Sequence, residues 1–371
     1  MEYFKAFDET PGFGTFNFIT GDNGAGKTHF LTAMASNVLS QLLNGQSGYE
    51  NLICLTSTVY EKFPRPLKKD SEYLSLHEKV YSYFGGRVNN NVFSDISPFR
   101  TIIKCFCRNE TRGFTFTLIK DLLTDLDFKS SVVCLFRDEE GQTKNIRSFK
   151  NVKEITLDFS MPPSQISEYI RRQILSNDLF LMDIKFERVS DTHSYGVREL
   201  SSGERNFVIT ILSIVFTIKN RSLILFDEPE NSMHPKWQEK ITSVIKLIVD
   251  EMSPESTVII ATHSPLVVSS VSNESVFIMN LPGDKIWKKS FYSGNNSDSV
   301  LKNQFGLVSS RSLNFVLKFQ ECLKLYTQGE INSFVHAMDD FFRYEVIIST
   351  DDPLYEAFNT LQELYVELKQ Q

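Results

Sequence analysis

A glycine-rich segment near the N-terminus constrains the fold more than any other part of the sequence. Residues 21–28 read GDNGAGKT and fit the spacing G-x-x-x-x-G-K-[ST]. A strand-prone apolar run at 16–19 precedes the segment, and apolar residues at helical spacing follow it from Phe30 to Leu42. The sequence therefore predicts a strand, a glycine-rich loop and a helix, the setting in which this motif holds phosphate. The alternative is a chance glycine-rich turn.

The residue types of this loop suit a nucleotide phosphate. Glycines let successive N–H groups face inward as an anion nest, and the following helix N-terminus adds partial positive charge. Lys27 can reach the β- and γ-phosphates, and Thr28 can offer its hydroxyl to Mg²⁺, which prefers oxygen ligands. The expected cofactors are ATP and Mg²⁺, and the candidate binding residues are Asn23, Gly24, Ala25, Gly26, Lys27, Thr28 and His29.

A second apolar run ends in two carboxylates. Leu223–Phe226 is continuously apolar, as expected of a parallel strand buried on both faces. Asp227 and Glu228 follow it, and an apolar strand ending in acidic residues supplies the metal-binding half of a phosphate-loop NTPase. We expect Asp227 to hold Mg²⁺ together with Thr28, and Glu228 to act catalytically by orienting the attacking water.

Two shorter motifs accompany this strand. Ser201 precedes an apolar helix and Glu204 follows three residues later, which is a capping-box pattern. Either the segment is only a capped helix, or Ser201, Ser202 and Gly203 point at a γ-phosphate held by another subunit. His263 follows the apolar run 258–261. A lone histidine is more often structural, but at the end of the next strand it is well placed to contact the γ-phosphate.

Together, GDNGAGKT, LSSGE, LILFDEPENSMHP and ATHSP resemble the ABC-type ATPases. The form DEPE followed by HP is typical of their soluble branch, which includes the overcoming-lysogenisation-defect (OLD) ATPases, the SMC-like repair ATPases and many phage-defence ATPases. The resemblance implies Walker A roles for Lys27 and Thr28, a Walker B role for Asp227, a catalytic glutamate at Glu228, a D-loop at 231–234 and a switch histidine at His263. It also implies a homodimer in which Ser201 of one copy completes the ATP site of the other. Ser202 stands where the family usually has glycine.

The Q-loop departs from the family pattern. It should follow the second strand, here Leu52–Thr56, yet no glutamine occurs there. Ser57, Thr58 or Tyr60 could fill the position, and Gln142 and Gln165 are poorer candidates.

The segments around the motifs suggest a domain plan. We expect an α/β fold, an ABC-type ATPase head with a mixed sheet, over residues 1–305. Its core would be 1–66 and 196–282, with an inserted lobe at about 67–195. Strand-like runs occupy Gly113–Ile119, Ser131–Arg137 and Glu154–Phe159, and a helix-like segment spans Ser164–Leu175. No heptad pattern is sustained, so a long coiled-coil arm is not expected.

Residues 306–371 are expected to form a helical appendage. Apolar faces recur from Ile331 to Phe342 and from Leu354 to Leu368, and Asp352–Pro353 reads as a helix start. This tail is shorter than the nuclease domain that some OLD proteins carry. Its helices either pack on their own domain or form a docking surface for an effector subunit.

Composition narrows the function classes. The net charge of -7 argues against a surface dominated by nucleic-acid binding. The five cysteines lack paired CxxC spacing, so reduced thiols are favoured over a zinc site. Charged residues interrupt any N-terminal signal-like run, and no stretch of about 18 apolar residues could span a membrane. These features predict a cytoplasmic protein.

Three function classes follow. The first is a regulatory ATPase of an anti-phage defence system, in which ATP-dependent dimer closure controls a separate toxin or nuclease. The second is an SMC-like DNA-repair or chromosome-maintenance ATPase, which DNA-stimulated hydrolysis would favour. The third is a nucleotide-binding subunit of a transporter, against which the Q-loop departure counts.

Overall fold

The computed structural model describes residues 12–58, 62–65, 74–89, 92–108, 113–138, 152–191, 193–271, 275–284, 286–289, 313–342 and 355–369. The chain divides into two compact units, Met1–Val300 and Leu301–Gln371. The first unit carries every motif discussed above.

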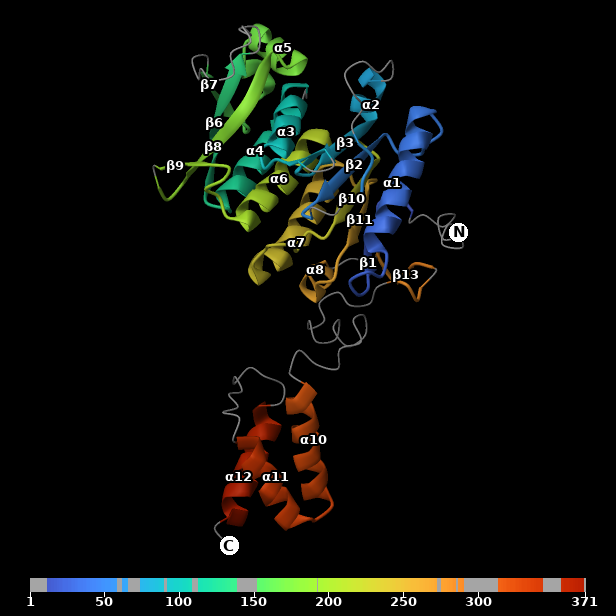
Figure 1. Ribbon diagram of the computed structural model, residues 1–371, viewed down its shortest axis with the longest axis vertical. Coiled ribbons are helices and arrows are strands. Elements are labelled where there is room, and N and C mark those ends of the chain that lie inside the picture. Colours follow the sequence, from blue (N-terminus) through green and yellow to red (C-terminus); the bar gives the residue numbers. More distant parts are fainter. Residues whose placement is uncertain are drawn as a thin grey trace. The chain divides into compact units, whose positions relative to one another are not determined.

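A seven-stranded sheet forms the centre of the first unit (Figure 1). Its strand order is β13 (Lys288–Lys289), β12 (Val276–Asn280), β1 (Phe16–Thr20), β11 (Thr257–Ala261), β10 (Ser222–Asp227), β2 (Asn51–Thr56) and β3 (Tyr81–Phe84). All neighbours pair in parallel except β12 and β13, which are antiparallel. Every residue of β1, β10 and β11 is buried, because helices cover both faces of the sheet.

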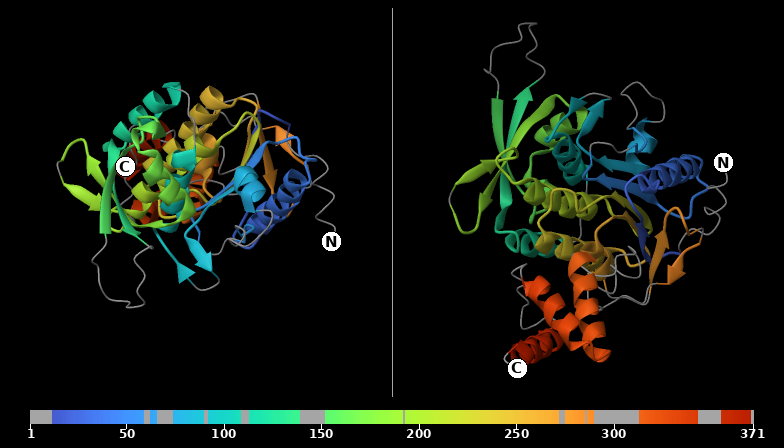
Figure 2. Two further views of the ribbon diagram at one scale, coloured as in Figure 1. Left: turned by 90° about the horizontal axis from the view of Figure 1, so that it is seen from above. Right: turned by 60° about the horizontal axis from the view of Figure 1, so that its bottom comes forward.

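Helices lie on both sides of this sheet (Figure 1, Figure 2). On one face, α1 packs its apolar side against alternate residues of the strands, including Leu52, Leu223 and Ile259. On the other face lie α6 and α7. The helices around the sheet are α1 (Lys27–Leu43), α2 (Leu74–Val80), α6 (Ser202–Thr217), α7 (Pro235–Met252) and α8 (Pro265–Ser269). The predicted α/β class with a mixed sheet around the glycine-rich loop is confirmed.

A second sheet, of four antiparallel strands, comes between the glycine-rich loop and the LSSGE segment in the sequence. Its order is β7 (Val152–Asp158), β6 (Phe128–Asp138), β8 (Leu179–Arg188) and β9 (Ser194–Gly196). The elements around it are α3 (Ser97–Arg108), α4 (Gly113–Thr124), the 3-10 turn η2 (Pro163–Gln165) and α5 (Glu168–Ser176), and a small hairpin joins β4 (Arg87–Asn89) to β5 (Val92–Phe93). The strands predicted at Ser131–Arg137 and Glu154–Phe159 are confirmed in β6 and β7.

The strand predicted at Gly113–Ile119 is wrong, because this segment is the start of helix α4. Phe116, Ile119 and Leu123 recur at helical spacing and are buried. Within the seven residues 113–119, helical spacing and strand alternation place the apolar side chains too similarly to be told apart. The helix predicted at Ser164–Leu175 begins later, at Glu168, where the hydroxyl of Ser167 caps it.

The second unit contains three helices, α10 (Leu313–Thr327), α11 (Ile331–Phe342) and α12 (Tyr355–Lys369). Their apolar faces form a common core of Phe319, Cys322, Phe334, Met338, Phe341, Phe358 and Leu361. The predicted helical tail is therefore confirmed, and its apolar residues pack on one another. The predicted helix start at Asp352–Pro353 and Leu354 lie outside the described residues.

Within the described residues, no group of histidine, cysteine or acidic side chains could hold a metal ion by itself. None of the helices described is long and apolar enough to cross a membrane.

Candidate functional site

The glycine-rich loop joins the end of β1 to the start of α1. Gly24 and Gly26 have φ angles of 83° and 95°, a left-handed conformation that glycine adopts readily. A side chain at Gly21 would collide with the carbonyl oxygen of Leu281. Glycine is thus required at 21 for close packing and at 24 and 26 for backbone conformation. The loop presents Asn23, Gly24 and the neighbouring His29 as exposed residues, with Ala25 half-buried.

Lys27 is the first residue of α1 and is only 4% exposed. Its ammonium group donates to the carbonyl oxygens of Gly21 (2.7 Å) and Asp22 (3.1 Å). The loop therefore holds a positive charge against its own backbone, next to the helix N-terminus.

Thr28 and Asp227 meet although 199 residues separate them in the sequence. The hydroxyl of Thr28 lies 3.0 and 2.9 Å from the two carboxylate oxygens of Asp227. Strand order explains the encounter, because β1 and β10 both flank β11 and all three run in parallel. A hydroxyl beside a carboxylate is a suitable pair of hard oxygen ligands for Mg²⁺.

The carboxyl group of Asp227 is fully buried. Burial raises its pKa from 3.8 to about 7, opposed by the hydrogen bond from Thr28 and reinforced by the charges of Glu228 and Glu230. A bound divalent cation would offset this cost, so the donor set fits Mg²⁺.

We expect Asp227→Asn to stabilise the metal-free and nucleotide-free protein at about pH 8. Between about pH 4 and 7 the folded state keeps a proton at Asp227 that the unfolded chain has lost, so stability falls as pH rises through this window. Removing the charge should therefore raise the free energy of unfolding by on the order of 1–4 kcal/mol at about pH 8. The gain should be much smaller at about pH 5. Denaturant unfolding in a chelator at both pH values measures it, and an equal gain at both would contradict the prediction.

Glu228 has an unusual backbone. Its φ is 51°, in the left-handed region that non-glycine residues rarely adopt and that is enriched at functional sites. Its N–H donates to the carbonyl of Ala261 (2.9 Å), and its carbonyl accepts from the N–H of Asn231 (3.2 Å). The chain therefore turns sharply at Glu228, whose side chain is half-buried at the sheet edge beside Asp227.

His263 follows β11 at the same edge. Its Nδ1 lies 3.9 Å from Oε1 of Glu228 and 3.0 Å from Oε1 of Glu230. The structure thus gathers Lys27, Thr28, Asp227, Glu228 and His263 around one end of the parallel strands. Glu230 was missed in the sequence. The signal that could have found it is a third carboxylate only two residues beyond Glu228.

The segment LSSGE starts helix α6 as predicted. Ser201 and Glu204 form a capping box, with the Glu204 N–H donating to the Ser201 hydroxyl (3.2 Å) and the Ser201 N–H donating to the Glu204 carboxylate (2.9 Å). Arg188 at the end of β8 binds Glu204 at 2.6 Å, and this hydrogen bond raises the pKa of Arg188. The helix start is therefore tied to the antiparallel sheet.

The start of α6 packs against the segment 231–234 of the same chain. The hydroxyl of Ser202 donates to the carbonyl of Ser232 (3.3 Å), and a side chain at the buried Gly203 would approach that same oxygen. The amide of Asn206 donates to the carbonyl of Asn231 (3.3 Å). Ser201 and Ser202 are exposed. Within the described residues, their side-chain hydrogen bonds go to Glu204 and Ser232, and not to the glycine-rich loop.

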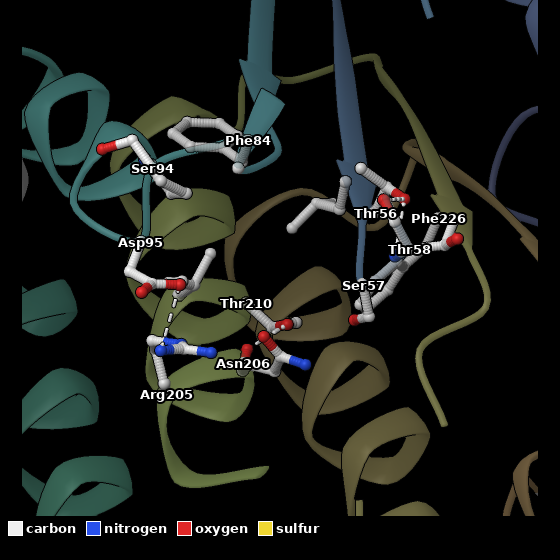
Figure 3. A pocket seen from close by; sticks show the side chains of 14 residues that line it. Thr56, Ser57, Thr58, Phe84, Ser94, Asp95, Arg205, Asn206, Thr210 and Phe226 are labelled. Atoms are coloured by element: carbon white, nitrogen blue, oxygen red, sulfur yellow. Dashed lines mark hydrogen bonds and ion pairs between the residues drawn. The ribbon is translucent and has the colours of Figure 1, made fainter. Parts of the chain in front are cut away.

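The end of β2, where the Q-loop was sought, borders a cavity of about 130 Å³ (Figure 3). Ser57 and Thr58 form one wall, and Arg205 and Asp95, 3.1 Å apart, form the opposite one. The N–H of Ser57 also donates to the carbonyl of Asp227 (3.3 Å). The cavity thus connects the carboxylate strand with α6 and the chain before α3.

Of the other Q-loop candidates, the structure describes Gln165, which does not line this cavity. Gln165 ends η2, where its amide donates to the carbonyl of Asp158 (2.7 Å). Tyr60 and Gln142 lie outside the described residues.

Comparisons with known proteins find a matching family model and several similar proteins. A family model described as "AAA domain, putative AbiEii toxin, Type IV TA system" matches residues 16–269. Septu protein PtuA of Bacillus thuringiensis is 24% identical over 384 aligned residues, which cover 91% of this chain and 89% of that protein. Retron Vc95 probable ATPase of Vibrio cholerae serotype O1 biovar El Tor is 25% identical over 228 residues, covering 57% of this chain and 43% of that protein. A solved SMC head bound to the C-winged helix domain of ScpA is 13% identical with a TM-score of 0.35, covering 75% of this chain and 90% of that one.

Proposed function

The chain belongs to this family of AAA domains, and on that premise we propose that it hydrolyses ATP between two copies of itself and thereby controls a separate effector in anti-phage defence. The observation that carries the ATPase assignment is the meeting of Thr28 with Asp227, beside Lys27 and Glu228. Two distant motifs supply complementary parts of one phosphate site.

Each residue of the site has a role that its position supports. The N–H groups of residues 23–29 and the Lys27 ammonium bind the phosphates. Thr28 and Asp227 would hold Mg²⁺, and the bound cation would supply positive charge opposite the phosphate oxygens. Glu228 orients the attacking water and accepts its proton, and His263 donates a hydrogen bond to the γ-phosphate.

The second copy enters the proposal through Ser201, Ser202 and Gly203. These residues start a helix whose N-terminus offers N–H groups and positive partial charge, a suitable cap for a γ-phosphate. In their own chain they pack on residues 231–234 instead of on the glycine-rich loop. This arrangement supports a site that a second copy completes.

A mixing experiment tests the shared site. Lys27→Ala and Ser201→Arg should each be inactive alone, because one lacks the phosphate-binding lysine and the other fills the cap with a bulky side chain. In a heterodimer of the two, one site carries both defects and the other is intact. We expect the heterodimer to regain up to about half of the wild-type turnover per dimer, and a random equimolar mixture up to about a quarter. Persistent inactivity of heterodimers verified by differential tags would contradict the shared site.

The defence role rests on the DEPE-HP form of the motifs and on the relatives named Septu protein PtuA and Retron Vc95 probable ATPase. The C-terminal helices offer a docking surface for the effector, because Ile331 and Val366 are exposed while their neighbours form the bundle core.

Purification from the native host tests the effector. We expect the tagged chain to co-elute with the product of a neighbouring gene identified by mass spectrometry. Val366→Glu should reduce this recovery at least about fivefold while leaving ATP turnover unchanged, since burying a charge at an interface is costly. If the chain elutes alone and deleting the neighbouring genes leaves its cellular phenotype unchanged, the effector proposal fails.

A further inference from the structure

Glu230 is a buried carboxylate to which the proposed ATP site has given no role. The residue is 4% exposed, and it follows the left-handed turn at Glu228. An ionised carboxylate is expensive to bury unless its oxygens are paired. Its contacts therefore indicate what the position is for.

Within the part of the chain that the structure describes, the hydrogen bonds of the Glu230 carboxylate converge on one oxygen. Oε1 accepts from the hydroxyl of Thr262 (2.7 Å), from the backbone N–H of His263 (2.6 Å) and lies 3.0 Å from Nδ1 of the His263 ring. Oε2 is buried and has no hydrogen-bond partner among the residues that the structure describes. The contacts of Oε1 are therefore directed at His263 and at its neighbour Thr262.

The chemistry of the contact fixes the ring. A carboxylate oxygen can only accept, so a hydrogen bond across the 3.0 Å contact needs its proton on Nδ1 of His263. Nε2 is then the nitrogen left to face a ligand, and the side chain of His263 is 44% exposed. The hydrogen bond from the His263 backbone N–H to Glu230 also fixes the path of the chain just after the end of β11.

We propose that Glu230 is a positioning residue that holds His263 by its Nδ1–H and turns Nε2 to the γ-phosphate, to which Nε2–H donates when both ring nitrogens carry protons. The inference rests on the proposed ATPase function and deepens it. Glu230 does not contact the nucleotide itself, so its effect on turnover passes through His263.

Two substitutions separate the parts of this role. Glu230→Gln keeps a carbonyl oxygen that can accept from Thr262 and His263 but removes the charge. Glu230→Met removes the acceptor at similar volume. The matched control is Glu239→Met, the same change at an exposed position of α7.

The kinetic readout is a double-mutant cycle. Glu230→Met should lower kcat by on the order of 10- to 100-fold with KM for ATP changed less than about threefold, as when an orienting partner of a reacting group is lost. In a His263→Ala background the same change should cost less than about twofold, because the residues act as one unit. Glu230→Gln should fall between wild type and Glu230→Met, and Glu239→Met should match wild type. An undiminished loss in the His263→Ala background would overturn the proposal.

The spectroscopic readout needs neither ATP nor turnover. Nitrogen-15 NMR of the six histidines, with His263 identified by its loss in His263→Ala, should show Nδ1 protonated in wild type and in Glu230→Gln. Glu230→Met should shift the proton toward Nε2. If the ring behaves so but wild type does not hydrolyse ATP, the proposed function fails and the positioning contact stands. If wild type hydrolyses ATP and the ring is indifferent to Glu230→Met, the positioning role fails alone.

Discussion

Glu228→Gln should abolish ATP hydrolysis while ATP stays bound. Glutamine keeps the size and the left-handed turn of this position but cannot accept the proton of the attacking water. The loss of a general base costs about 10²- to 10⁴-fold, so we expect kcat to fall by at least about a hundredfold. KM or Kd for ATP should change little, because the phosphates are held by Lys27 and the loop.

Trapped ATP should also stabilise the closed form. With ATP and Mg²⁺, Glu228→Gln should run as a dimer on size exclusion and return toward the wild-type elution volume when the nucleotide is removed. Glu239→Gln, on the exposed side of α7, is the control for the loss of a carboxylate. Turnover within about threefold of wild type would show that another group activates the water.

Lys27→Ala should produce the largest loss of ATP affinity. Lys27 is buried, and its ammonium group donates to the carbonyl oxygens of Gly21 and Asp22 in the glycine-rich loop. These contacts hold the positive charge close to where the phosphates would bind. A hydrogen bond to a charged group is worth about 1.5–3 kcal/mol, which corresponds to a loss of affinity of about 10- to 150-fold. Titration with a fluorescent ATP analogue measures this directly.

The matched control for Lys27→Ala is Lys120→Ala at an exposed position of α4. It removes the same charge from the chain and should leave affinity within about twofold of wild type. Equal losses in both variants would mean that net charge, and not the position of Lys27, governs binding. An unaltered affinity in Lys27→Ala would remove the phosphate-binding role of the loop.

Local motifs carried the prediction of the α/β class and of most site candidates. The loop 21–28 needs glycine where φ is positive, and a parallel strand buried on both faces must be continuously apolar up to Asp227. Both requirements act on residues that are adjacent in the sequence. The capping box of Ser201 and Glu204 is equally local, and it is present as predicted.

Prediction from the sequence failed where a pattern was short or fitted more than one structure. The segment Gly113–Ile119 alternates well enough to read as a strand, and only its packing against β6 and α6 selects the helix α4. At the end of β2, no single residue type marks the sensor position. The cavity beside Ser57 and Thr58 could not be predicted, because α6 and the chain before α3, which are distant in sequence, form its other walls.

By itself, the sequence determined the phosphate loop, the carboxylate strand and the order of the motifs, because each depends on neighbours within a few residues. The tertiary structure alone decided that Thr28 lies against Asp227, that Ser202 packs on Ser232, and that Glu230 is buried beneath His263. These contacts depend on the order of the strands in the sheet. That order is set by the burial of all the apolar faces together, which no short stretch of sequence contains.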